Sequence, residues 1–237
     1  MKLLSPNNNS KIRNNIELLS IHIPKTAGTS FRNVLKSVYG SRSVSRLDIR
    51  SGGKKIEVER KQLRGNRLSP RIRVVHGHFR YKDFTELFEC GESLPVITWM
   101  RDPVERVVSN YYYLAGVLAN ELQEEKKGLN ILAKMQRSLI EYAGNEISRN
   151  RMYKFLDGMP LEQFRFVGIH EHYREDLADL MALLGFEKFP DYRVNVTAQK
   201  REVDEDTLQK IRELNALDME LYEEALRLRE QRKGNIR

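Results

Sequence analysis

Residues 16–39 decide how this chain folds, and they read IELLSIHIPKTAGTSFRNVLKSVY. Residues 16–23 form an apolar run typical of a short buried strand, and residues 31–39 place apolar side chains at helical spacing. Residues 24–30 are therefore predicted to be a strand-to-helix turn. A turn of this kind directs backbone N–H groups and the positive end of a helix dipole at a bound anion.

The turn contains the side chains that a phosphate-binding loop uses. A lysine supplies a compact positive charge, a glycine lets the backbone approach the ligand, and hydroxyl groups donate hydrogen bonds. These residues are Lys25, Thr26, Gly28, Thr29 and Ser30. An ordinary helix N-cap contains the same residue types, so the turn alone leaves both interpretations open. The kinase-type pattern G-x-x-x-x-G-K-[ST] is not matched, because the lysine here precedes the only glycine.

A second strand-to-helix turn is predicted within residues 95–113, which read PVITWMRDPVERVVSNYYY. An apolar run ends at Arg101, and the Asp-Pro pair at 102–103 is typical of a helix start. Ser109 then lies about two turns into the helix. An arginine fork and a hydroxyl could together clamp a second anionic group. For Arg106, the alternative is a local ion pair with the acid one or four positions before it.

With both turns considered, the chain resembles sulfotransferases that use 3′-phosphoadenosine 5′-phosphosulfate (PAPS). It is most similar to the carbohydrate branch that includes heparan sulfate 2-O-sulfotransferase. In that family a P-K-x-[AG]-[GS]-T-[ST] loop holds the 5′-phosphosulfate and an R-D-P-x-x-R-x-x-S-x-[YF] segment holds the 3′-phosphate, which residues 24–30 and 101–111 match. The cofactor contacts that the resemblance implies are Lys25, Thr26, Ala27, Gly28, Thr29, Ser30, Arg101 and Ser109. It also implies adenosine 3′,5′-bisphosphate (PAP) as a product and no need for a metal.

Two histidines near the end of a third apolar run are candidates for the catalytic base. Residues 73–79 read RVVHGHF, and a His-Gly-His at this place resembles the segment that carries the base in the carbohydrate branch. The match predicts His78 as the base and His76 in a supporting catalytic role, while a purely structural His76 is the alternative. A sugar hydroxyl attacks sulfur only if a group accepts its proton, and imidazole titrates near neutral pH. Lys25 would stabilise the charge on the departing phosphate.

Polar segments near the C-terminus add further candidates. In related enzymes a loop corresponding to residues 195–201 closes over the nucleotide, and its side chains are expected to donate to the 3′-phosphate. These side chains are Thr197, Lys200 and Arg201. The spacing of His170 and His172 would suit a metal pair, which we disfavour because no acid or cysteine is patterned with them. Residues 204–206 spell D-x-D, but acids at a helix start favour the dipole, so capping is predicted.

The composition fits one domain spanning residues 1–237. Apolar residues make up 40% of the chain, enough to bury one core, while residues 1–14 and 230–237 are expected to fray. The single cysteine, Cys90, excludes an internal disulfide and suits a reducing compartment. The sequence shows neither a signal peptide nor an apolar run of about 18 residues. Because animal enzymes of the family carry a membrane anchor, we expect a bacterial cytoplasmic protein or a trimmed lumenal domain.

Positive charge is concentrated in residues 42–73. This segment has eleven Lys or Arg and three acids, and the whole chain carries a formal charge of +8. We interpret it as a basic insertion that could guide an acidic polysaccharide to the site, the alternative being a solvated, partly mobile insertion. A nucleic-acid-binding module is disfavoured because the segment contains no Phe, Tyr or Trp to stack on bases.

Together these patterns predict an α/β fold with a central, mainly parallel sheet flanked by helices, and a phosphate-binding turn after the first strand. Helices are expected over residues 118–142, 146–156, 173–184 and 204–228, with a strand over 164–169. The predicted function is PAPS-dependent O-sulfation of a carbohydrate. A small-molecule or lipid sulfotransferase is the runner-up, and a kinase of the P-loop kind or a nucleic-acid-binding protein are the alternatives from other classes. An oligomer is possible.

Overall fold

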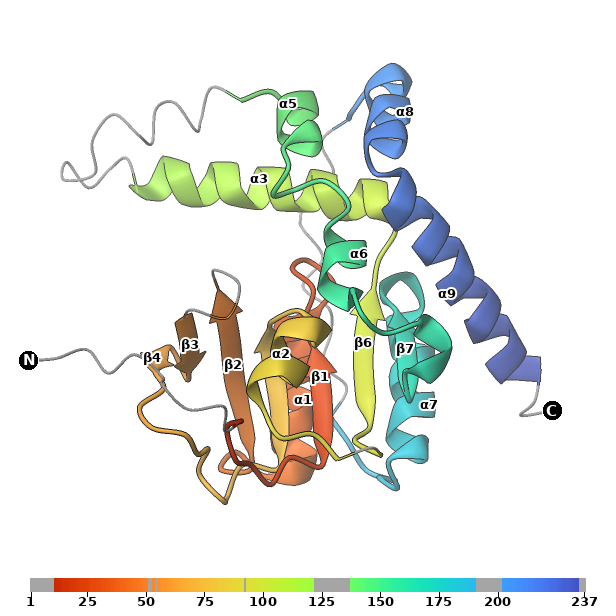
Figure 1. Ribbon diagram of the computed structural model, residues 1–237. Coiled ribbons are helices and arrows are strands. Elements are labelled where there is room, and N and C mark those ends of the chain that lie inside the picture. The colour runs from red at the N-terminus through yellow and green to blue at the C-terminus, as the bar shows by residue number, and fades with distance from the viewer. Residues whose placement is uncertain are drawn as a thin grey trace, which may run out of the picture.

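The computed structural model describes residues 11–50, 53, 55–91, 93–121, 137–190 and 202–234. Among them, seven strands form one sheet in the order β4-β3-β2-β5-β1-β6-β7 (Figure 1). The strands are β1 (Leu18–Ile21), β2 (Val44–Arg50), β3 (Lys55–Val58), β4 (Lys61–Gln62), β5 (Val74–His78), β6 (Val96–Met100) and β7 (Phe166–Ile169). Strands β2, β5, β1, β6 and β7 pair in parallel, and β3 and β4 add antiparallel at one edge. The predicted mainly parallel α/β fold is confirmed.

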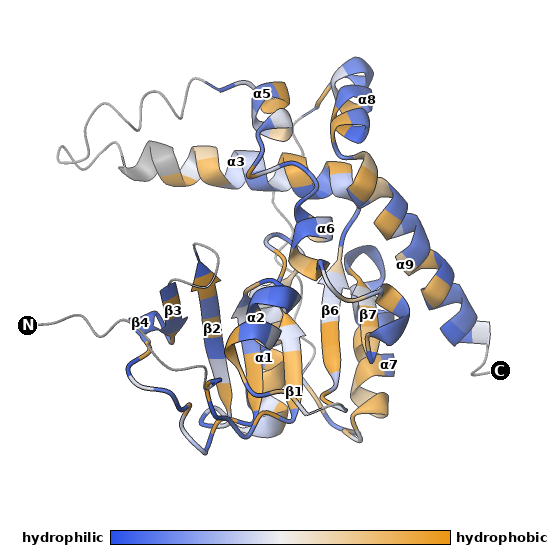
Figure 2. Cartoon of the chain, viewed as in Figure 1, coloured by the Kyte–Doolittle hydropathy of each residue, from blue (hydrophilic) through white to orange (hydrophobic). Residues whose placement is uncertain are grey.

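Helices cover both faces of this sheet. The α-helices of the described residues are α1 (Gly28–Tyr39), α2 (Tyr81–Leu87), α3 (Pro103–Glu121), α5 (Leu139–Gly144), α6 (Arg151–Leu156), α7 (Tyr173–Leu183), α8 (Glu205–Leu214) and α9 (Ala216–Gly234), of which α1, α2, α6, α7 and α9 pack on the sheet. One core cluster joins the sheet to α1 and α7, with Phe31 and Leu177 as members. Another joins it to α2, α6 and α9, with Phe84, Met152 and Ala225. Because strands covered on both faces meet no water, β1, β6 and β7 are largely apolar runs rather than alternating ones (Figure 2).

Beyond the carboxyl ends of the parallel strands, α3, α5 and α8 form a separate layer (Figure 1). Val107, Ala143 and Ile211 supply the buried contacts among these helices. Helix α3 begins directly after β6, as the Asp-Pro pair predicts, and Asp102 Oδ1 accepts a 2.8 Å hydrogen bond from the Glu105 N–H. The layer therefore faces the edge of the sheet where ligands bind in open α/β folds.

The basic segment 42–73 is part of the sheet, so the interpretation as a mobile insertion is wrong for the residues of β2. Strand β2 pairs with β5 on one side and β3 on the other. Its residues Val44, Leu47 and Ile49 are buried, and their apolar pattern is short and interrupted by charges. Because its apolar residues are separated by charged ones, this interior strand was not predicted from the sequence.

Several predicted boundaries differ from the structure. Ile12 is buried and bridges to Phe88, so this part of the N-terminal segment does not fray, and α9 continues to Gly234. The single helix predicted over 204–228 is divided at Asn215, whose buried side chain accepts a 3.0 Å hydrogen bond from the Asn150 N–H. Of the helix predicted over 118–142, residues 122–136 lie outside the described residues. No helix in the described ranges has both the length and the apolar character to cross a membrane.

Candidate active site

The predicted phosphate loop joins β1 to α1 at the carboxyl end of a central strand. Lys25 and Ala27 adopt left-handed backbone conformations, with φ of 72° and 70°. Such conformations are unfavourable for residues other than glycine, and they cluster at active sites and ligand-binding turns. Ala27 is the N-cap of α1 and provides no side-chain acceptor for the first N–H groups of the helix. The positive end of α1 is thus presented to the space in front of the loop.

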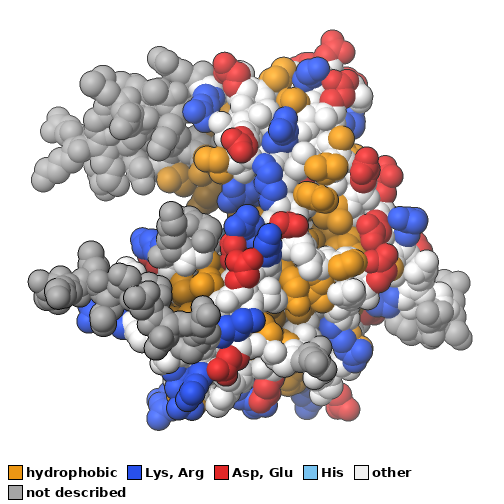
Figure 3. All heavy atoms as spheres, viewed as in Figure 1, with side chains coloured by type: hydrophobic (Ala, Val, Ile, Leu, Met, Phe, Trp, Pro, Cys, Tyr) orange, Lys and Arg blue, Asp and Glu red, His pale blue; other side chains and the backbone are white. Residues whose placement is uncertain are grey.

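A cavity of about 540 Å³ lies between this loop and α3, within the range of roughly 300–1,000 Å³ typical of ligand pockets. Most of the predicted cofactor residues line it together: Lys25, Ala27, Gly28, Thr29, Ser30, Arg101 and Ser109. His78 also lines it. On the face shown in Figure 3, the surface is indented between the α3 layer and the sheet, with Lys and Arg side chains beside the indentation. Two turns that are distant in sequence therefore form one basic cavity, which we call the large cavity.

The hydroxyl group of Thr26 is used within the loop itself. Thr26 is fully buried, and its Oγ1 donates a 2.8 Å hydrogen bond to the Ile23 carbonyl. Of the predicted loop contacts, this side chain does not line the large cavity. Thr26 therefore closes the turn, and the prediction that its hydroxyl contacts the cofactor does not fit this structure.

Arg101 and Ser109, which line the large cavity, have unused hydrogen-bond donors. Arg101 Nη1 donates to the Lys25 carbonyl at 3.3 Å, while its buried Nε and the buried Ser109 Oγ have no hydrogen-bond partner. Lys25 Nζ lies 4.3 Å from the ring centre of Tyr113, and burial, followed by the charge of Arg101, lowers the pKa of its ammonium group. Leaving a buried polar group unsatisfied costs about 1–3 kcal/mol. These residues fit a ligand with phosphate groups, which would satisfy both donors.

The geometry of His78 suits a general base. Its Nδ1 lies 2.8 Å from the His22 carbonyl oxygen. Because a carbonyl only accepts, Nδ1 carries the proton and Nε2 is left with a free lone pair. Burial lowers the pKa of His78, although the His22 carbonyl and Asp48 oppose this effect. The neutral imidazole in the large cavity can therefore accept a proton at Nε2.

His76 is placed differently. Its side chain is 2% exposed, and its Nδ1 lies 2.9 Å from Ser20 Oγ. Burial, followed by the charge of His78, lowers the pKa of His76 to about 3. It lines a second, smaller cavity and not the large one. His76 is therefore neutral, and it does not line the cavity that holds Lys25, Arg101 and His78.

His22 is a site residue that the sequence did not single out. Its ring is stacked between those of His76 and His78, with centroid distances of 4.8 Å and 4.3 Å. Burial, followed by the two neighbouring imidazoles, lowers the pKa of His22 well below its ordinary value. Gly28 makes room for this ring, because a Cβ there would lie 1.9 Å from His22 Nε2. The only sequence signal was a histidine at the end of each of two predicted strands.

Arg106 is structural. It is 1% exposed, its guanidinium lies 3.5 Å from the buried carboxylate of Asp218, and Nη2 donates to the Ser148 carbonyl at 3.4 Å. The predicted local ion pair with Glu105 or Asp102 is wrong for Arg106. The residue instead ties α3 to α9, which the sequence could not show because its partner is remote in the chain.

The remaining candidates divide into three groups. Thr197, Lys200 and Arg201 lie outside the described residues. His170 lines the large cavity and His172 does not, and the described part of the chain contains no group of three or more potential His, Cys, Asp or Glu ligands placed to hold a metal. Asp204 caps α8, accepting a 2.8 Å hydrogen bond from the Thr207 N–H, which confirms the capping interpretation.

The structure is that of an α/β protein in which the turn after the first strand, the start of α3 and His78 line one basic cavity. A family model described as the sulfotransferase family matches residues 8–223. The chain belongs to the sulfotransferase family, whose members are transferases. Among solved structures it is similar to mouse sulfotransferase SULT7A1 complexed with PAP, with 11% identity and a TM-score of 0.43, over 89% of this chain and 67% of that one. No curated protein matches the sequence.

Proposed function

We propose that this protein transfers the sulfuryl group of PAPS to a hydroxyl group of a carbohydrate by in-line displacement. The observation that carries the proposal is the convergence of Lys25, Arg101, Ser109 and His78 on the large cavity. Donors for phosphate and an acceptor for a proton are thus placed within one space. Most of the catalysis in such a transfer comes from positioning and electrostatics.

Each part of the site has a role in this proposal. PAPS, when bound, supplies the sulfuryl group and a 5′-phosphate as its leaving group. Lys25 and the first N–H groups of α1 stabilise negative charge at that phosphate. Arg101 and Ser109 hold the 3′-phosphate with donors that are otherwise unsatisfied. His78 takes the proton of the attacking hydroxyl on Nε2, while the His22 carbonyl keeps Nδ1–H oriented.

The proposed acceptor is an acidic polysaccharide. Arg46 on β2 and Arg60 at the β3–β4 turn both line the large cavity. Their positive charge at the cavity that His78 also lines supports an acceptor that carries carboxylate or sulfate groups. A transfer assay with labelled PAPS tests the proposal across sulfated and desulfated polysaccharides, neutral glycans, small alcohols and lipids. Transfer only to lipids or small molecules would show that the acceptor is not a carbohydrate. No transfer to any of these classes would overturn the proposed function.

Cofactor binding is expected to depend on Arg101. Replacing Arg101 with alanine removes charge-assisted hydrogen bonds to a phosphate, and the affinity for PAP should fall by about 10- to 100-fold. Isothermal titration calorimetry measures this change directly. Arg149→Ala is the matched control, because Arg149 is exposed and does not line the large cavity. Equal affinity in the Arg101 variant and the wild type would refute the assigned phosphate contact.

The pH profile should reflect the lowered pKa of His78. The base acts only when its imidazole is neutral, and burial holds its pKa below the ordinary 6.5. The midpoint of the decline in kcat/KM toward acidic pH is therefore expected to lie below pH 6.5. A midpoint above pH 6.5 would show that His78 is not a buried, neutral base.

A further inference from the structure

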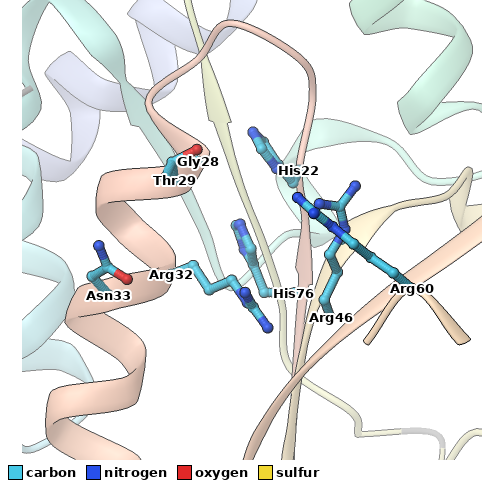
Figure 4. A pocket seen from close by; sticks show the side chains of 9 residues that line it. His22, Gly28, Thr29, Arg32, Asn33, Arg46, Arg60 and His76 are labelled. Atoms are coloured by element: carbon cyan, nitrogen blue, oxygen red, sulfur yellow. The ribbon is translucent and has the colours of Figure 1, made fainter. Parts of the chain in front are cut away.

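A second cavity, of about 140 Å³, adjoins the large cavity beside the phosphate loop (Figure 4). The two share five lining residues: His22, Gly28, Thr29, Arg46 and Arg60. Arg32 from α1 and His76 from β5 also line the smaller one. Figure 4 shows the three arginine side chains approaching the space around His22 and His76 from α1, β2 and the β3–β4 turn. We call this space the arginine cavity.

The charges around the arginine cavity favour an anion. Arg32 is paired with Glu59, and Arg46 Nε donates to Asp48 at 2.7 Å, but neither acid lines the cavity. Arg60 makes no ion pair with any residue in the described ranges, which leaves three guanidinium groups against two carboxylates. The positive end of α1 lies at the same place. A buried Arg32 Nε without a hydrogen-bond partner adds an unused donor.

The turn that carries Arg60 is strained. Glu59 and Arg60 are the two loop residues between β3 and β4, with φ of 48° and 64°. A two-residue hairpin with both φ positive is ordinarily built from Asn-Gly or Asp-Gly, and other residues there destabilise the fold. Glu59 helps to stabilise the fold at this turn, because its carboxylate accepts a 2.8 Å hydrogen bond from the Arg46 N–H. Arg60 makes no comparable contact with the residues that the structure describes, so its place in the lining of both cavities indicates a role in binding.

The size of the arginine cavity limits what it can hold. Pockets that enclose a whole ligand measure roughly 300–1,000 Å³, so a space of about 140 Å³ suits one charged group of a larger molecule. That molecule would extend into the large cavity, next to His78. We propose that the arginine cavity binds a carboxylate or sulfate group of the acceptor, and that Arg46 and Arg60 determine the specificity for acidic acceptors. This inference rests on the proposed function.

A binding experiment tests the inference with PAP present at saturation. The probe is a fluorescent oligosaccharide of glucuronate and N-acetylglucosamine, compared with its carboxyl-reduced form and with a carboxyl-reduced, N-sulfated form. Wild-type protein should bind the glucuronate form about tenfold more tightly than the carboxyl-reduced one, as expected for one charge-assisted contact. Tighter binding of the glucuronate form than of the carboxyl-reduced form would identify the carboxylate as the recognised group. Tighter binding only of the carboxyl-reduced, N-sulfated form would identify the sulfate.

Variants distinguish the arginine cavity from the basic surface in general. Arg60→Gln should abolish most of the preference, whereas Arg64→Gln should retain it, because Arg64 is exposed and lines neither cavity. Arg60→Gly relieves the strain of the turn, so a loss of preference in that variant cannot be attributed to unfolding. The inference is overturned if wild-type protein shows no preference for either acidic form, or if the preference survives in both Arg60 variants. Failure of PAP to bind the wild type would instead count against the proposed function.

Discussion

Replacing His78 with alanine is expected to lower the rate of sulfuryl transfer by about 10²- to 10⁴-fold, the usual contribution of a positioned general base. The reason is the tautomer that the structure imposes: Nδ1–H is directed to the His22 carbonyl, so Nε2 is the atom that can accept a proton. The substitution leaves Lys25, Arg101 and Ser109 in place. The affinity for PAP should therefore remain close to that of the wild type.

The measurement combines turnover of labelled PAPS with calorimetric binding of PAP to the same preparations. His172→Ala is the matched control, because His172 is exposed and does not line the large cavity. If the His78 variant keeps its turnover, the base is another group, and the stacked ring of His22 is the next to test. If PAP binding is lost along with turnover, His78 supports the shape of the cavity and its role as base is not demonstrated.

Replacing Gly77 with alanine is expected to destabilise the fold by about 3 kcal/mol or more, at the upper end of overpacking effects. A Cβ at Gly77 would lie 1.7 Å from the Leu47 carbonyl oxygen. Both residues belong to the interior of the sheet, where Gly77 pairs with Leu47 on β2 and Ile21 on β1. The strands would have to separate, and backbone on both sides prevents this without loss of hydrogen bonds.

Urea unfolding followed by circular dichroism measures this effect. Gly91→Ala is the control, since nothing lies within 4 Å of a Cβ at that position, and surface changes of this kind are usually within about 0.5 kcal/mol. An unfolding midpoint for Gly77→Ala equal to that of the wild type would mean that β2 and β5 do not pair as described.

The loop residues were predictable because the signals that specify them are local. A strand, a turn rich in small residues and a helix follow one another within residues 16–39, and the backbone of such a turn points to the sheet edge whatever the rest of the chain does. The direction of each side chain was not predictable in the same way. Thr26 turns inward to Ile23, since the left-handed residues beside it redirect the chain.

For residues 42–73, the composition led to the prediction of a basic insertion, whereas the structure shows that this segment contains a strand of the sheet. Its excess of Lys and Arg is typical of a solvated surface, yet Leu47 and Ile49 lie in the core and β2 occupies the interior of the sheet. The same strand brings Arg46 to the cavities. A strand with alternating charged and apolar residues can serve both the core and a site, because successive side chains point to opposite faces.

Local sequence was sufficient for the strand-to-helix turn at residues 24–30 and the start of α3 after Asp102, because each depends on neighbours within a few residues. The succession of apolar runs and helical patterns predicted the α/β class, and His78 was chosen as the candidate base from the resemblance to the carbohydrate branch. Three features depend on the tertiary structure and could not be predicted from the sequence. His22 stacks between His76 and His78, and Arg106 pairs with Asp218. Arg46 and Arg60 line the large cavity. The physical reason is strand register. Parallel strands pair through connections of dozens of residues, and the alignment of their ends follows from packing of the whole sheet.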